Sequence, residues 1–87
     1  MKVVVPTQLR SYTGGRAEVS ADGVTLDDVL RDLDRQFPGL AAQLLEGSDL
    51  KASIAVSIDG EIGTAGLLET ISENSEVHFL PALGGGL

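Results

Sequence analysis

The chain has 87 residues, of which 43% are hydrophobic, and this is enough for one domain around one core. Thirteen acidic residues against six basic ones give a formal net charge of −7, which argues against nucleic acid and against anionic membranes, because both need clustered lysine and arginine. The lack of cysteine, with His78 as the one histidine, excludes disulfides, thiolate chemistry and sites of clustered cysteine or histidine for a metal.

The remaining exclusions concern location and the role of the charge. No apolar run is long enough for a membrane span and no signal peptide is visible, so we expect a cytoplasmic protein. The acidity has two open interpretations. It either keeps a small domain soluble, or it steers the domain toward a basic protein partner.

Two strands joined by a glycine turn are predicted at the N-terminus. The β-branched run Val3-Val4-Val5 favours a strand over residues 1–9, covered on much of both faces. Residues 11–15 contain two glycines that tolerate positive φ, and residues 16–21 alternate between apolar and polar. The pattern predicts a hairpin.

An amphipathic helix is predicted from Leu26 to Phe37. Thr25, followed by Asp28 three residues later, is typical of a capping box, and Pro38-Gly39 ends the segment. The apolar side chains recur at helical spacing and form one stripe, consisting of Leu26, Val29, Leu30, Leu33 and Phe37.

Shorter elements are predicted after this helix, before a tail. They are a short helix over 40–45, a loop over 46–49, a strand over 53–59, a turn at Asp59-Gly60, an edge strand at 61–62, a helical turn around 67–71 and a last strand over 76–80. We therefore expect an α+β domain over residues 1–80, with a mixed sheet crossed by one main helix and with the first and last strands central. Residues 81–87 are expected to be a flexible tail without regular structure.

The order of these elements resembles the β-grasp fold of ubiquitin. The ending Val77-His78-Phe79-Leu80-Pro81-Ala82-Leu83-Gly84-Gly85-Gly86 resembles the ending of the ThiS and MoaD sulfur carriers, in which a strand runs into a proline, small or apolar residues and a terminal Gly-Gly. Val5 to Arg10, followed by Thr13-Gly14-Gly15, resembles the first hairpin of the CysO-type carriers, which serve cysteine biosynthesis.

The resemblance implies a carrier that is not itself an enzyme and binds no cofactor of its own. An E1-like adenylating and sulfurtransferase enzyme would use ATP to activate the carboxylate of Gly86 and convert it to a thiocarboxylate. A sulfur-accepting synthase would then take the sulfur. Gly84 and Gly85 would thread a narrow channel, because glycine has no Cβ.

This sequence departs from the family's ending in two ways, since the active form in the family ends in glycine and not in Leu87, and since three glycines stand here in place of two. We predict that Leu87 is removed, as JAMM-type metalloproteases do for some relatives. Leu80 and Leu83 are predicted to dock the activating partner, because strand alternation turns Val77 and Phe79 toward the helix and Leu80 away from it. Leu80 covered by a loop, or serving as one scattered surface leucine, is the alternative. His78 is interpreted as a lone surface histidine.

The sequence leaves the destination of the sulfur open. Cysteine synthesis is favoured by the hairpin resemblance, while methionine, thiamin, molybdopterin or a sulfur-containing natural product remain possible acceptor pathways. Two other functions also stay open. One is a protein modifier joined to a partner lysine through Gly86, and the other is a scaffold subunit that never carries sulfur.

Overall fold

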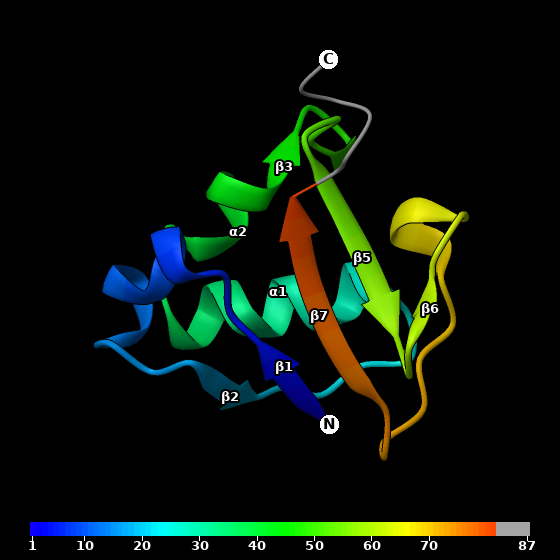
Figure 1. The fold of residues 1–87 in the computed structure, drawn as a ribbon, viewed down its shortest axis with the longest axis horizontal. Helices are drawn as coiled ribbons and strands as arrows, with labels where there is room; N and C mark the ends of the chain where they lie inside the picture. Colours follow the sequence, from blue (N-terminus) through cyan, green and yellow to red (C-terminus); the bar gives the residue numbers. More distant parts are fainter. Residues whose placement is uncertain (82–87) are drawn as a thin grey trace.

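The computed structural model describes residues 1–81 and consists of a mixed sheet with one main helix across it (Figure 1). The five-stranded sheet has the order β2-β1-β7-β5-β6, built from β1 (Lys2–Val4), β2 (Glu18–Ser20), β5 (Ile54–Ile58), β6 (Glu61–Ile62) and β7 (Glu76–Pro81). The first and last strands run parallel at the centre, and the other neighbours are antiparallel. The predicted α+β fold with central β1 and β7 is confirmed.

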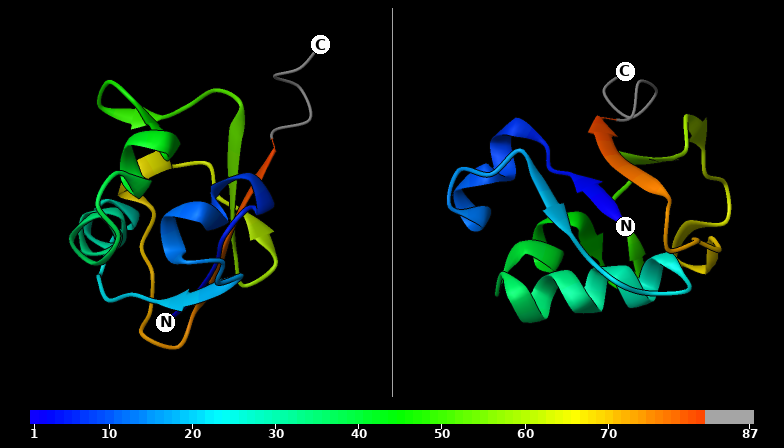
Figure 2. Two further views of the ribbon diagram at one scale, coloured as in Figure 1. Left: turned by 90° about the vertical axis from the view of Figure 1, so that its left-hand side faces the viewer. Right: turned by 90° about the horizontal axis from the view of Figure 1, so that it is seen from below.

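The helix α1 (Leu26–Gln36) packs across one face of this sheet, and the two layers are visible from the side in Figure 2. The predicted stripe is its buried face, since Leu26, Val29, Leu30 and Leu33 are almost fully excluded from solvent. Val3, Val56, Val77 and Phe79 meet it from the sheet. The aliphatic stripe and the alternating strands therefore share one core, which holds the fold together by burial of apolar surface.

The start of α1 is fixed by the predicted capping box. The Asp28 amide donates to Thr25 Oγ1 over 3.3 Å, and Asp28 Oδ2 accepts from the amides of Thr25 and Val24 over 3.2 Å each. These backbone hydrogen bonds hold the pKa of Asp28 below its usual value. A Cβ at Gly23 would lie 2.7 Å from the Asp28 Cβ, so the close approach requires glycine there.

The first hairpin has a longer connection than predicted, because residues 7–13 form a 3-10 helix, η1 (Thr7–Thr13), and not the end of a strand and a tight turn. Pro6 has no amide hydrogen to continue the ladder, and its carbonyl accepts from the Leu9 amide over 2.9 Å. Both halves of the hairpin still pair, with Val3 opposite Val19.

The middle of the chain also differs from the prediction. The short helix α2 (Leu40–Leu44) is present, but the expected loop after it contains a small hairpin of β3 (Leu45–Glu46) and β4 (Asp49–Leu50) that turns at Gly47, with φ of 64°. The Asp59-Gly60 turn has positive φ at both residues, as a tight hairpin requires. The helical turn η2 (Gly66–Leu68) ends before Ile71, which is buried.

The last strand is one residue longer than expected, since β7 includes Pro81. The predicted tail therefore begins inside the strand, and residues 82–87 lie outside the described part of the chain. Among the helices that the structure describes, none is long and apolar enough to cross a membrane.

Candidate functional site at the end of the last strand

The end of β7 carries Leu80 on the outer face of the sheet, away from α1. Val77 and Phe79 are 0% and 3% exposed in the core, whereas Leu80 is 38% exposed. The alternation of a strand sends successive side chains to opposite faces, which is the basis of this split. The geometry agrees with the outward orientation that was predicted for Leu80.

Small and apolar neighbours surround Leu80. In the ladder it is opposite Ala55 of β5, while His78, two residues earlier, lies between Val4 of β1 and Ser57 of β5. Alanine is too short to cover a leucine beside it. The outer face is therefore apolar at the end from which the tail leaves.

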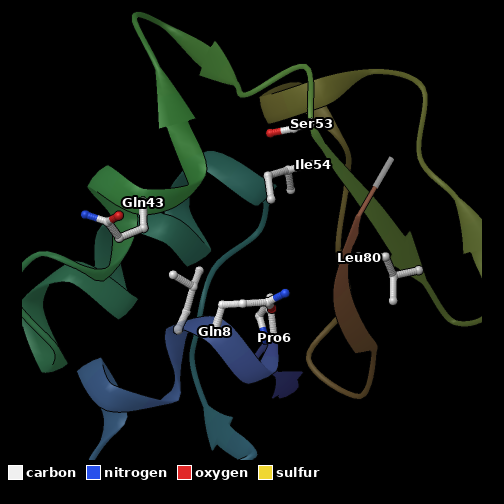
Figure 3. Close-up of a pocket in the computed structure, with 7 residues that line it drawn as sticks. Pro6, Gln8, Gln43, Ser53, Ile54 and Leu80 are labelled. Atoms are coloured by element: carbon white, nitrogen blue, oxygen red, sulfur yellow. The ribbon is translucent and has the colours of Figure 1, made fainter. Parts of the chain in front are cut away.

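A shallow groove of about 200 Å³ lies beside the end of β7 and has Leu80 at its edge, while Figure 3 shows the Leu80 side chain turned away from Gln8 and Ile54 across the strand. Its walls come from three parts of the fold, namely η1 with its preceding proline, α2 and the start of β5. A second hollow of about 330 Å³ extends it toward β1 and shares Pro6, Gln8 and Leu80 with it. We call this pair of hollows the tail-side groove, and it is lined chiefly by Pro6, Gln8, Leu9, Gln43, Ile54 and Leu80.

The other end of β7 is charged. The Lys2 ammonium lies 3.1 Å from the Glu18 carboxylate and 3.7 Å from that of Glu76, and His78 Nε2 lies 2.9 Å from Glu76 Oε1. The hydrogen bond to Glu18, followed by the charges of both carboxylates, raises the pKa of Lys2. The hydrogen bond with His78, and then the charge of Lys2, lowers the pKa of Glu76.

His78 lies at the surface as interpreted, with 36% of its side chain exposed, but it is not isolated, because its ring contacts the Glu76 carboxylate. The outer face thus changes along β7 from a charged network near Glu76 to an apolar surface near Leu80.

Several predicted site residues cannot be placed. Leu83, Gly84, Gly85, Gly86 and Leu87 lie outside the described residues, so their roles stay predictions. Within residues 1–81 no group of three or more histidine, cysteine, aspartate or glutamate side chains is arranged to hold a metal ion.

The groove residues Gln8, Gln43 and Ile54 were not predicted as site residues from the sequence. Residues 7–9 are predicted to continue the first strand. A strand there would not form the groove wall that η1 provides. The available signal was Pro6, since a proline directly after a valine run favours a break in the ladder.

The fold defines a ubiquitin-like β-grasp protein whose last strand lies at the centre of the sheet. The sequence profile of the ThiS family matches residues 3–86, and the chain belongs to this family. The chain is 35% identical to the sulfur carrier protein CysO of Mycobacterium tuberculosis, over 97% of this chain and 96% of that protein. It is also 30% identical to small archaeal modifier protein 3 of Haloferax volcanii, over 75% of this chain and 73% of that one.

Solved structures agree with this assignment. The crystal structure of Mycobacterium tuberculosis CysO superposes with a TM-score of 0.87 at 33% identity, covering 94% of this chain and 98% of that one. A chain in the BexX/CysO complex of Amycolatopsis orientalis superposes with a TM-score of 0.89 at 30% identity, covering 94% of both chains. The resemblance to the CysO type thus extends through the sequence and the fold.

Proposed function

We propose that this protein is a sulfur carrier whose C-terminal carboxylate, at Gly86, is activated and converted to a thiocarboxylate. The observation that carries the proposal is the match to CysO along 97% of the chain. The family match supports it further, because it extends to Gly86 itself. Leu80 at the end of β7 supplies a contact surface directly before the tail.

The chemistry needs a carboxylate that a partner can reach. An oxygen of the Gly86 carboxylate attacks the α-phosphate of ATP and pyrophosphate leaves. Hydrogen sulfide, supplied as HS⁻ in the site of the activating enzyme, then attacks the acyl carbon and AMP leaves, so that sulfur replaces one oxygen of the carboxylate. Gly84 and Gly85 suit the approach, because a backbone without Cβ passes through a narrow channel. The carrier contributes the carboxylate and the docking surface, while the partner contributes ATP and the catalytic groups.

The proposed docking surface for the E1-like enzyme is Leu80 with the tail-side groove. Ordering a glycine costs about 1–2 kcal/mol per residue, so contacts by the folded domain must offset the threading of the tail. Full burial of a leucine side chain contributes about 1.5–3 kcal/mol to the free energy of binding. Because 38% of Leu80 is exposed before the partner binds, covering it contributes about 1 kcal/mol. The rest must come from the groove and from Leu83.

The final steps concern Leu87 and the acceptor. We propose that a JAMM-type protease removes Leu87, since a carboxylate on Leu87 would lie one residue beyond the reactive position at Gly86. A sulfur-accepting synthase then receives the sulfur, and the likeness to CysO favours cysteine synthesis.

Intact mass spectrometry of the protein purified from its native host tests both steps. We expect a chain that ends at Gly86 and a fraction in which one oxygen is exchanged for sulfur. A chain that always keeps Leu87 and never gains sulfur would contradict the proposal.

A second function, conjugation to other proteins, is favoured by the similarity to small archaeal modifier protein 3. It uses the same activated carboxylate, but the acceptor is a lysine amine that forms an isopeptide bond while AMP leaves. Mass spectrometry of host proteins digested with a protease that cleaves after Leu83 distinguishes the two, because the chain has no lysine or arginine after Lys51 at which trypsin could cut. A lysine carrying the Gly84-Gly85-Gly86 remnant would show conjugation, and its absence beside a detectable thiocarboxylate would leave the sulfur-carrier function alone.

A further inference from the structure

A second groove follows the exposed side of α1 and shares no lining residue with the tail-side groove. It consists of two adjoining hollows of about 530 and 430 Å³, which have Asp27, Arg31 and Leu45 in common. The walls are α1, α2, the β3–β4 hairpin and η2. We call it the helix-side groove, and its principal side chains are Asp27, Arg31, Asp34, Asp49, Leu67 and Leu68.

Leu68 is the most exposed large apolar side chain in the described part of the chain, at 79%, and it lies at the rim of this groove. The loop that carries it is well fixed. The Glu69 carboxylate accepts hydrogen bonds from the amides of Thr64 and Ala65 over 2.7 and 2.6 Å, and the Glu69 carbonyl accepts from the Leu26 amide over 2.9 Å. Leu68 is therefore an apolar group that is held in place and left open to solvent.

The same loop is pressed against the β3–β4 hairpin. Gly66 has φ of 57°, and a Cβ there would lie 2.8 Å from Asp49 Oδ1. Leu68 and Asp49 line the same hollow, so an apolar side chain and an acidic side chain lie side by side in the groove.

The charged side chains that line the groove indicate the charge of the partner it can bind. Three carboxylates, those of Asp27, Asp34 and Asp49, line it together with one guanidinium, that of Arg31. Arg31 pairs with Asp27 over 3.1 Å, so Asp34 and Asp49 are the uncompensated charges. Each also accepts one backbone hydrogen bond, from Gly39 and Leu50 respectively. With a net charge of −7 on the chain, a basic partner is attracted and an acidic one repelled.

We propose that the helix-side groove docks a basic segment of a second protein, with an apolar side chain against Leu68 and a lysine or arginine beside Asp34 or Asp49. Asp27 and Asp34 are two turns apart on α1, about 10 Å, which a short extended segment spans. Because the two grooves share no residue, this partner stays bound while another protein engages Leu80 and the tail. The proposal goes beyond the sulfur-carrier function and does not depend on it.

The test uses the full chain labelled with ¹⁵N and two synthetic peptides. In one a leucine is flanked by arginines, and in the other the same leucine is flanked by glutamates. We expect the basic peptide to shift the amide resonances of α1, β4 and η2, and to bind at least about tenfold more tightly than the acidic one. Equal affinity for the two peptides, or shifts centred on β7, would overturn the proposal.

Two variants with matched chemistry complete the test. Leu68→Ser is expected to weaken the basic peptide about tenfold, whereas Ile62→Ser, which removes a 60% exposed side chain from the edge strand β6, leaves binding unchanged. Equal loss in both variants, or no loss in Leu68→Ser, contradicts the docking site. Shifts in the same resonances on raising the protein concentration without peptide would assign the groove to a second copy of this chain, and would overturn the proposal as well.

Discussion

Leu80 is paired with Ala55 across the antiparallel β7–β5 ladder, on the sheet face that α1 does not cover. The methyl group of alanine is too small to cover the leucine, which stays open to solvent. Leu80 directly precedes Pro81, the last residue of β7. Leu80 is thus an exposed apolar side chain at the end of β7.

The docking prediction follows from that pair. Leu80→Asp is expected to leave the fold intact, because the side chain is on the outer face, and to lower ATP–pyrophosphate exchange by the activating enzyme about tenfold or more. Ile62→Asp is the matched control, since it places the same charge on an exposed apolar position of β6. Exchange at the parental rate in Leu80→Asp would remove Leu80 from the interface.

A stability prediction concerns the buried face of α1. Val29 is fully excluded from solvent, so Val29→Asp buries a charge without a partner, at a cost of several kcal/mol that a domain of this size cannot absorb. We expect circular dichroism to show an unfolded chain. Val24→Asp, at a position that is 68% exposed just before the helix, should cost less than about 1 kcal/mol. Similar melting curves for Val29→Asp and the parent would refute the packing described above.

The acid dependence of stability follows from three carboxylates. The pKa of Asp28 is lowered chiefly by the Thr25 amide, that of Asp32 by Arg35, and that of Glu76 by His78. A folded pKa below the unfolded one means that the unfolded chain binds more protons, so the stabilisation is present above the unfolded pKa and is lost as the pH falls through the folded one.

Thermal melts between about pH 6 and pH 2 check this sign. We expect the melting temperature to fall as the pH decreases, and to fall less steeply for Asp28→Asn, which has already lost the charged acceptor. Glu73→Gln is the control, because it removes an exposed carboxyl group other than these three. A steeper fall in Asp28→Asn than in the parent would contradict the assignment.

The processing prediction concerns Leu87. One residue displaces the carboxylate by up to about 3.3–3.6 Å, which misplaces an attack that needs near-contact geometry. Chains that end at Leu87, Gly86 and Gly85 should be compared for adenylation and thiocarboxylate formation. We expect only the form ending at Gly86 to be fully competent. Equal activity of the form ending at Leu87 would show that no processing is needed.

Local patterns in the sequence were sufficient for much of the fold. The capping box at Thr25 and Asp28, the stripe from Leu26 to Leu33 and the Asp59-Gly60 turn each depend on neighbours within one or two turns of chain, so their spacing alone predicts them. The outward orientation of Leu80 follows in the same way, from the two-residue period of a strand.

Contacts between distant segments decided the rest. Residues 7–13 and 45–50 are short stretches whose apolar content suits several conformations, and only their packing on the rest of the molecule makes them a 3-10 helix and a hairpin. Both grooves are built from elements far apart in the sequence, and so is the contact that presses Gly66 against Asp49. Residue spacing cannot predict such surfaces, because they form only where segments that are distant in the sequence pack against each other in the fold.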